Sequence, residues 1–440
     1  MKHFFNNAKE LYLGSNEIDR PTYLGPLARS MHTQIIGATG VGKTESAMLT
    51  LFFDSIRNGH SVIFIDPKGD RSTLELIKAL CTLANRENDL VQIDLGNTKD
   101  SASYNPLKIG SPSELKDKIV GSVIWTEEFY KKVAERILLN IFLIFEKANV
   151  PISINLLTEF LSNPKKFAKT AICAGASLQA DFESLCKMIE LNQRNIEGLK
   201  ADQELWTRSE IGIILSRPES DSVLDWIQGR KIVYINLQTL AFEETSRRFG
   251  RLILQDLKTA VQRLQSMDQK KRPTTSLFID EFASIASSGF IELLNKARSA
   301  NVQMTLAHQS LGDLTVVSPA FADQILDNTN TKIIFRIDSP DSSDFFARLI
   351  GTRKSEKKTN QVNSNFFLGS AQTGMGTTRD TDEFVISPNE FRRLGRGEAF
   401  VLTKIPYQVS KVEMKSISKW ISVYSTKQTE RRTFWSNLLN

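Results

Sequence analysis

The sequence has few residues suited to disulfide or metal chemistry. Only three of its 440 residues are cysteines and only four are histidines. Cys81, Cys173 and Cys186 form no C-x-x-C pair, and the histidines form no H-E-x-x-H motif. The sequence therefore indicates neither a disulfide framework nor a zinc hydrolase, and we expect the cysteines to be reduced and buried.

Long hydrophobic runs are also missing. The longest strongly apolar stretch is Ile137–Phe145, which is about half as long as a bilayer-spanning helix requires. The amino-terminal residues Met1–Asn7 lack the apolar core of a signal peptide. We therefore expect no membrane span in this chain and a cytoplasmic location, with attachment to the inner membrane only through an anchor or partner outside the chain.

The overall composition is that of a globular protein. Hydrophobic residues make up 41% of the chain and charged residues 24%, which excludes a mainly disordered chain or a collagen-like repeat. The length predicts two to four domains. A net charge of +6 is compatible with a nucleic-acid partner but does not by itself indicate one.

Strand patterns alternate with helix patterns in the first hundred residues and again after residue 230. This alternation predicts a parallel sheet with helices on both faces. The predicted strands are His32–Ile36, Ser61–Ile65, Leu90–Leu95, Lys231–Asn236, Thr275–Asp280, Val302–Ala307, Lys332–Ile337 and Glu398–Lys404. The predicted helices are Thr44–Arg57, Leu74–Ala84, Ser246–Leu264 and Phe290–Ala300.

The segment between these halves has helical periodicity only. It predicts helices at Ser113–Val120, Glu127–Lys147, Ile154–Phe160, Pro164–Ala174, Leu178–Asn192 and Ile196–Glu210. We therefore expect an α/β nucleotide-binding domain built from residues 1–111 and 218–440, with an all-α domain of residues 112–217 inserted into it.

A second unusual region, Gly351–Glu383, has no pattern of regular structure. It begins with basic residues and continues with many Asn, Ser, Thr and Gly residues. We expect a long irregular loop, which is either functional or a solvated surface insertion. The segment Arg348–Lys358 is a candidate for contacts with nucleic-acid phosphates.

The sharpest motif is a phosphate-binding loop at Gly37–Thr44, which reads GATGVGKT and fits G-x-x-x-x-G-K-[ST] at every fixed position. It lies between a predicted strand and a predicted helix, as the motif requires. Glycines let successive backbone N–H groups face an anion, and the helix N-terminus favours phosphate. We expect Lys43 to reach the β- and γ-phosphates and Thr44 to ligate Mg²⁺. The predicted nucleotide contacts are Gly37, Thr39, Gly40, Val41, Gly42, Lys43, Thr44 and Glu45.

An apolar strand that ends in two carboxylates completes this site. The segment Leu277–Glu281 reads LFIDE, so Asp280 is placed to hold Mg²⁺ and Glu281 to polarise the attacking water. No N-K-x-D motif is present, because Asn295-Lys296-Ala297-Arg298 lacks the final Asp. ATP is therefore the better expectation than GTP, with Mg²⁺ as its partner.

Several further segments occur in an order that resembles one family. They are IDPKGD at Ile65–Asp70, YNPL at Tyr104–Leu107, FIDEFAS at Phe278–Ser284, TLAHQS at Thr305–Ser310, NTKIIFR at Asn330–Arg336 and FVISPNEFRRLGRGEAF at Phe384–Phe400. Together with HTQIIGATGVGKT at His32–Thr44, which contains the phosphate loop, they resemble the type IV secretion and conjugation coupling proteins of the TraD/TraG kind. These proteins belong to the HerA/FtsK superfamily of hexameric P-loop motors. The resemblance implies a RecA-like P-loop NTPase fold.

The resemblance also implies roles for individual residues. Gln309 would sense the γ-phosphate, and Arg298 would act as an arginine finger on the nucleotide of a neighbouring subunit. Arg336 is a rival candidate for the finger. Asp66 and Lys68 lie beside the expected site and are given only an ancillary role.

The function that follows is an ATPase that works as a homohexameric motor. It would translocate DNA, single-stranded and without sequence specificity, into a type IV secretion or conjugation channel, with channel or relaxosome proteins as partners. Three alternatives stay open at this point: a coupling ATPase that recruits protein effectors, a cytosolic HerA-like DNA-processing motor, and a nucleotide-dependent switch. Family members usually begin with two membrane helices, so the chain either starts after them or is a soluble variant.

Overall fold

The computed structural model describes residues 10–168, 176–365 and 369–421. Its centre is one sheet of eleven strands in the order β2-β1-β13-β12-β9-β3-β8-β7-β4-β6-β5. The strands from β9 to β5 pair in parallel, and those from β2 to β12 join the other side antiparallel. The parallel strands are β3 His32–Ile36, β4 Ser61–Asp66, β5 Leu90–Asp94, β6 Ile232–Asn236, β7 Thr275–Ile279, β8 Val302–His308 and β9 Thr329–Ile334.

The antiparallel side comprises β1 Leu11–Ser15, β2 Pro21–Leu24, β12 Glu398–Lys404 and β13 Tyr407–Met414. Sequence patterns predicted the eight strands β3 to β9 and β12, and the structure confirms them with shifted ends. The largest shift is at β9, which begins three residues before the predicted Lys332. Its first residues, Thr329, Asn330 and Thr331, are buried but polar, so they carry no apolar signal.

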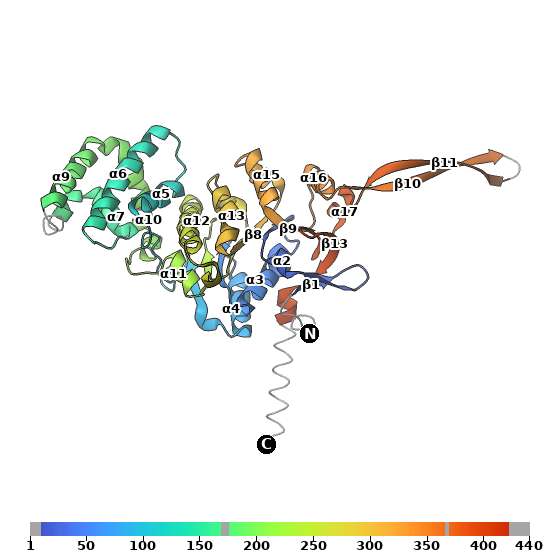
Figure 1. The fold of residues 1–440 in the computed structure, drawn as a ribbon, viewed down its shortest axis with the longest axis horizontal. Helices are drawn as coiled ribbons and strands as arrows, with labels where there is room; N and C mark the ends of the chain where they lie inside the picture. Colours follow the sequence, from blue (N-terminus) through green and yellow to red (C-terminus); the bar gives the residue numbers. More distant parts are fainter. Residues whose placement is uncertain (1–9, 169–175, 366–368, 422–440) are drawn as a thin grey trace, which may run out of the picture.

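Helices cover both faces of the sheet, as the alternation predicted (Figure 1). On one face, π-helical turn η1 Lys43–Met48 continues into α3 Leu49–Arg57, and α4 Arg71–Leu83 packs beside it. On the other face lie α11 Val223–Gln228, α12 Glu243–Gln265, α13 Phe290–Ala297 and α15 Pro319–Asn328. The remaining helices outside the helical block are α2 Pro26–Arg29, α14 Leu311–Thr315, α16 Pro340–Ile350 and α17 Pro388–Arg393, with 3-10 turns η2 Glu87–Asp89, η6 Gln269–Lys271, η7 Phe282–Ser284 and η8 Arg298–Ala300.

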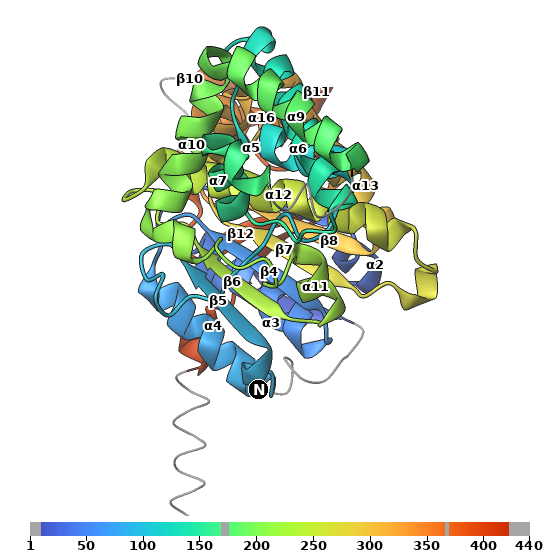
Figure 2. The ribbon, with the colours of Figure 1, turned by 90° about the vertical axis from the view of Figure 1, so that its left-hand side faces the viewer.

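Between β5 and β6 the chain forms a block of helices at one end of the molecule (Figure 1, Figure 2). In the described part of the predicted helix Pro164–Ala174, residues Pro164–Phe167 form a 3-10 turn and Ala168 is helical, and residues 169–175 lie outside the described residues. The domain boundaries stay a prediction. The helices of this block are α5 Pro112–Ser122, α6 Glu128–Lys147, α7 Ile154–Ser162, η3 Pro164–Phe167, α9 Ala176–Leu191, η4 Gln193–Ile196, α10 Glu197–Arg208 and η5 Glu210–Ile213.

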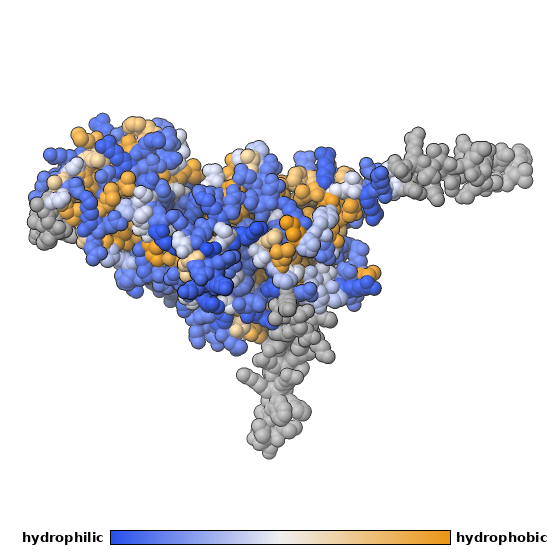
Figure 3. All heavy atoms as spheres, viewed as in Figure 1, coloured by the Kyte–Doolittle hydropathy of each residue, from blue (hydrophilic) through white to orange (hydrophobic). Residues whose placement is uncertain are grey.

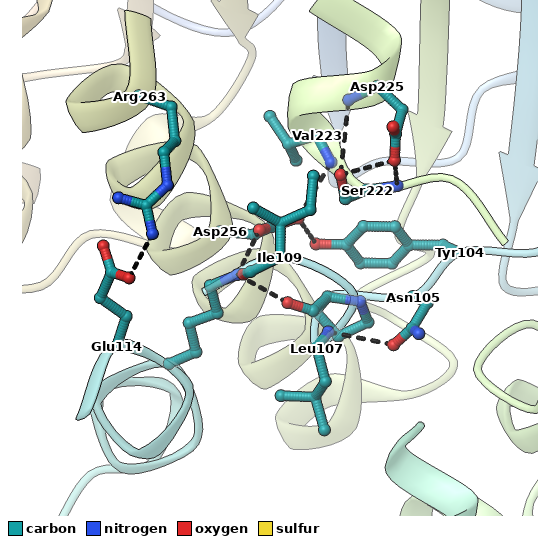
Figure 4. A network of polar contacts seen from close by, with 12 residues as sticks. Tyr104, Asn105, Leu107, Ile109, Glu114, Ser222, Val223, Asp225, Asp256 and Arg263 are labelled. Carbon is teal, nitrogen blue, oxygen red and sulfur yellow. Dashed lines mark hydrogen bonds and ion pairs between the residues drawn. The ribbon is translucent and has the colours of Figure 1, made fainter. Parts of the chain in front are cut away.

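A buried polar network joins this block to the sheet-covering helix α12 (Figure 4). The Asp256 carboxylate accepts hydrogen bonds from the Lys118 ammonium at 2.7 Å, the Tyr104 hydroxyl at 2.9 Å and the Val223 N–H at 2.9 Å. Lys118 and Asp256 are both almost fully buried. Since a buried charge is tolerated only when it is paired and hydrogen-bonded, these contacts fix α5 and the YNPL segment against α12.

The prediction of an irregular loop at Gly351–Glu383 is wrong. The chain forms a long antiparallel hairpin of β10 Thr352–Asn365 and β11 Gly369–Phe384, which projects from the body (Figure 1). Its strands pair through backbone hydrogen bonds, and their sequence is almost entirely polar. The alternation of apolar and polar residues by which a half-buried strand is recognised is therefore missing.

The described residues contain no helix that is long and apolar enough to cross a membrane. Figure 3 shows one face of the molecule, on which hydrophilic side chains predominate and apolar patches are scattered between them.

Candidate functional site

The sheet order brings the predicted phosphate and metal residues to one edge. Strand β8 lies between β3 and β7, and all three run parallel. The phosphate loop follows β3, Asp280 and Glu281 follow β7, and Gln309 follows β8. The carboxyl ends of neighbouring parallel strands form a crevice where open α/β sheets bind their ligands. The separate motifs of the sequence therefore form one site.

The phosphate loop has a backbone that only glycine allows without strain. Gly40 and Gly42 have φ angles of 77° and 101°. A side chain at Gly37 would meet the Phe335 side chain at 2.6 Å, so this position also needs glycine. A hydrogen bond holds the loop against the residues that follow β9: the Ala38 N–H donates to the Arg336 carbonyl at 2.8 Å.

Lys43 is buried at the centre of this loop. Its ammonium donates to the carbonyls of Gly37 at 2.6 Å and Ala38 at 2.9 Å. Burial lowers its pKa because the ammonium loses water, while the Asp280 carboxylate opposes the shift. The ammonium therefore already lies inside the loop whose backbone N–H groups could hold a phosphate.

Thr44 and Asp280 make the contact expected of a divalent-metal site. The Thr44 hydroxyl donates to Asp280 Oδ2 at 2.8 Å, although 236 positions separate the two residues in the chain. Asp280 is buried, and Glu281 follows it with a φ of 40°, in the left-handed region that is rare for non-glycine residues. A hydroxyl and a carboxylate beside a phosphate loop are hard oxygen ligands that could hold Mg²⁺.

Lys68 has a larger part in this site than the sequence suggested. Its ammonium lies 3.4 Å from Asp280 Oδ2 and 3.1 Å from Glu281 Oε1, so it neutralises both carboxylates. Burial alone would lower the pKa of Lys68, but these two carboxylates raise it overall. Burial also raises the pKa of Asp66 to about 6, while the Tyr234 hydroxyl, which donates to it at 2.7 Å, acts against the rise.

Glu45, predicted as a nucleotide contact, accepts hydrogen bonds from residues near the carboxyl end of the described part of the chain. It accepts hydrogen bonds from the hydroxyls of Ser416, at 2.8 Å, and Ser418, and Arg396 lies 3.6 Å away. Glu45, Arg396 and Ser416 line a pocket of about 650 Å³ beside the phosphate loop. The pocket could receive the base and sugar of a nucleotide. Sequence reasoning missed Ser416 and Ser418, and only the GRGEAF segment pointed toward this region.

The other predicted residues lie at different distances from the loop. Gln309 is exposed, and its N–H donates to the Asp313 carboxylate at 2.8 Å, which fixes the backbone at the end of β8. Arg336 lies beside the phosphate loop, because its carbonyl accepts the hydrogen bond from the Ala38 N–H. Arg298 precedes the amino end of β8, at the sheet edge opposite to Lys43, and lines a pocket with Asn295 and Asn328. Within one chain the structure therefore does not bring Arg298 to the phosphate loop.

Two buried histidines, His32 and His308, and the partly buried His60 predict a pH-dependent stability. Burial lowers the pKa of His32, His60 and His308 from 6.5 to about 4. Between these values the unfolded chain binds more protons, so stability should fall as the pH falls, by up to about 1.4 kcal/mol per histidine and pH unit. Asp66 acts in the opposite direction below pH 6, because its raised pKa makes the folded state bind the extra proton.

Denaturant unfolding at pH 7, 6 and 5 measures this effect. We expect the unfolding midpoint to fall steadily, and a His60→Gln variant to show a shallower slope because one of the three histidines is missing. An unfolding midpoint that is unchanged from pH 7 to pH 5 would contradict the prediction.

Comparisons with known proteins agree with this arrangement. Residues 274–396, which include the strand before Asp280 and Glu281, match the family model described as "TraM recognition site of TraD and TraG". The type 4 coupling protein DotL of Legionella pneumophila is 31% identical over 99 residues. That alignment covers 20% of this chain and 12% of DotL, so it spans only a small part of the relative.

Solved structures of bacterial conjugative coupling protein TrwB share the fold over most of the chain. The unbound form lacking its amino-terminal segment has a TM-score of 0.64 at 15% identity and covers 89% of this chain and 86% of its own. TrwB in complex with ADP and Mg²⁺ has a TM-score of 0.64 at 14% identity, with coverages of 93% and 94%. VirB4 of Thermoanaerobacter pseudethanolicus has a TM-score of 0.59 at 14% identity, with coverages of 93% and 97%. The resemblance to coupling proteins of the TraD/TraG kind and the RecA-like P-loop fold are thus confirmed.

Proposed function

We propose that this chain, which resembles the type IV coupling proteins of the TraD/TraG kind, is an ATP-hydrolysing subunit of a homohexameric motor. The motor would move single-stranded DNA, without reading its sequence, toward a secretion or conjugation channel at the inner membrane. Channel or relaxosome proteins would be its partners. The observation that carries the proposal is the convergence of Lys43, Thr44, Asp280 and Glu281 at one edge of the sheet.

Different residues of the chain would carry out different parts of ATP hydrolysis. Lys43 would neutralise charge on the β- and γ-phosphates, and Glu281 would orient the attacking water and accept its proton. Thr44 and Asp280 would hold Mg²⁺, which when bound neutralises phosphate charge. Lys68 would balance part of the charge of both carboxylates before nucleotide arrives, since its ammonium lies within 3.4 Å of each.

The position of Arg298 supports a ring. It lies across the sheet from the phosphate loop of its own chain, so it can act on a nucleotide only when a second subunit presents one. An arginine supplied by a neighbour stabilises the charge that develops on the transferred phosphoryl group. Arg336, which lies beside its own phosphate loop, remains the alternative for a role within one chain.

Steady-state ATP hydrolysis with and without single- and double-stranded DNA tests the function. A DNA motor is expected to hydrolyse faster when single-stranded DNA is present. Turnover indifferent to both forms of DNA would contradict DNA as the cargo and favour the recruitment of protein effectors.

Basic residues at the base of the projecting hairpin give a prediction for DNA binding. Arg348, Arg353 and Lys354 are all exposed where α16 meets β10. Replacing Arg353 and Lys354 by Gln should weaken DNA binding equally for all sequences and reduce the slope of log K against log salt by about 1 to 2. A titration with labelled single-stranded DNA at several salt concentrations measures this change.

The matched control replaces two exposed lysines elsewhere, Lys78 on α4 and Lys132 on α6, by Gln. It removes the same charge but should leave the salt slope unchanged. An equal loss of DNA affinity in both variants would show that the net charge of the protein, and not the base of the hairpin, determines DNA binding.

A further inference from the structure

His32 stands at the amino end of β3, the strand that continues into the phosphate loop. Its side chain is buried and makes two hydrogen bonds to backbone groups of different elements. The Met304 N–H donates to Nδ1 at 3.0 Å, and Nε2 lies 3.0 Å from the Leu294 carbonyl oxygen. Because an amide N–H can only donate and a carbonyl can only accept, the ring must carry its proton on Nε2.

Leu294 belongs to the last turn of α13, four residues before Arg298. His32 contacts the Leu294 carbonyl from outside the helix, so this hydrogen bond ties the last turn of α13 to the start of β3. The chain then passes through the single 3-10 turn η8 to Asn301, which has a φ of 64°. The His32 ring is thus a side-chain donor to the carbonyl of Leu294, one helical turn before Arg298.

The same face of β3 makes a second contact, two residues further along. The Gln34 amide lies 2.8 Å from His308 Nε2, and His308 Nδ1 lies 2.8 Å from the Ser310 carbonyl oxygen. Ser310 follows Gln309 at the end of β8. Strand β3 therefore holds the end of α13 through His32 and the segment around Gln309 through Gln34.

We propose that His32 is a positioning residue for Arg298, and that β3 couples the phosphate loop of one subunit to the arginine that this subunit presents to its neighbour. The inference rests on the proposed function. It gives a role to the first residue of the segment His32–Thr44, which lies outside the phosphate loop and acts through the last turn of α13. Misplacement of a catalytic group by about 1 Å can cost on the order of 100-fold in rate, so the end of this helix needs such a fixed contact.

Two substitutions separate the two hydrogen bonds of His32. In His32→Asn the side-chain oxygen can still accept from Met304, but no donor reaches Leu294. In His32→Gln a donor is available at the position of Nε2. We expect His32→Asn to lower kcat at least about 10-fold with KM and nucleotide Kd within about 2-fold, and His32→Gln to stay within about 3-fold of the unchanged protein.

His60 provides the matched control. It is also largely buried near the amino ends of the strands, where Nδ1 lies 3.0 Å from both Ser276 Oγ and Gln303 Nε2. None of these contacts involves α13. His60→Asn should therefore leave kcat unchanged, and an equal loss in His60→Asn and His32→Asn would overturn the proposal.

ATP turnover by mixtures of two variants distinguishes the positioning role of His32 from a general structural defect. A His32→Asn chain keeps its own phosphate loop, and a Lys43→Ala chain keeps a correctly placed Arg298. Mixing the two should restore turnover, because the mixed ring contains complete sites. Mixing His32→Asn with Arg298→Ala should restore none. Failure of the first mixture would overturn the proposal.

The outcomes also distinguish this inference from the proposed function. If Arg298→Ala hydrolyses ATP normally, the role of Arg298 itself is wrong. If Arg298→Ala is inactive and His32→Asn hydrolyses normally, only the positioning role of His32 is wrong.

Discussion

Replacing Lys43 by Ala is expected to reduce ATP turnover by at least about 100-fold while the protein stays folded. Removing one preorganised charge from a site where charge develops has an effect of this size. Stability should change little, because burial penalises the ammonium, as the lowered pKa of Lys43 shows. Steady-state hydrolysis and thermal unfolding of the same preparation measure both quantities.

Lys332 offers a matched control for Lys43. It is a second buried lysine, and its ammonium donates to the carbonyls of Leu326 at 2.8 Å and Thr329 at 2.9 Å, away from the phosphate loop. Lys332→Met should retain turnover at temperatures where it is folded. Normal turnover in Lys43→Ala would mean that the phosphate site is misassigned.

Replacing Arg298 by Ala should abolish hydrolysis and leave ATP binding intact. An arginine finger contributes on the order of 10³- to 10⁵-fold to the rate of phosphoryl transfer, and Arg298 makes no contact with the phosphate loop of its own chain. Binding of a fluorescent nucleotide and steady-state turnover measure the two properties separately.

A mixture of Arg298→Ala and Lys43→Ala chains tests whether the arginine acts between subunits. Each chain supplies what the other lacks, so the mixture should recover part of the turnover. Replacing Arg336 by Ala is the comparison within one chain. If Arg336→Ala is inactive and Arg298→Ala is active, the finger has been assigned to the wrong residue.

The sequence predicted the parallel half of the sheet because its strands are continuous buried runs. All of the predicted strands except β9 were found with both ends within one residue. The strands β1, β2 and β13 of the antiparallel side gave no such signal and were missed. The hairpin of β10 and β11 was mistaken for a loop, because its pairing rests on the backbone and not on an apolar face.

The proximity of the two motifs of the candidate site could be expected for a different reason. Lys43, Thr44, Asp280 and Glu281 lie in two short motifs whose spacing is dictated by the phosphate and metal chemistry, and their contact is seen in the bond from Thr44 to Asp280. The contacts around them could not be predicted. Glu45 and Ser416 are 371 positions apart, and a hydrogen bond between such distant side chains leaves no local pattern.

The hydrogen bond between His32 and Leu294 is a second contact that no local sequence pattern could predict. It spans 262 positions, and its acceptor is a backbone carbonyl, which every residue type carries. A single histidine at the start of an apolar strand therefore looks like any buried histidine. Only the path of α13 across the sheet reveals that it holds the turn before Arg298.

The rate of ATP hydrolysis per subunit, measured across protein concentrations with single-stranded DNA present, tests the central claim most directly. If the site is completed by Arg298 of a neighbour, activity per subunit should rise cooperatively as rings assemble. Activity per subunit that is constant down to concentrations where the protein is a monomer would contradict the account, since each chain would then hydrolyse ATP with its own residues alone.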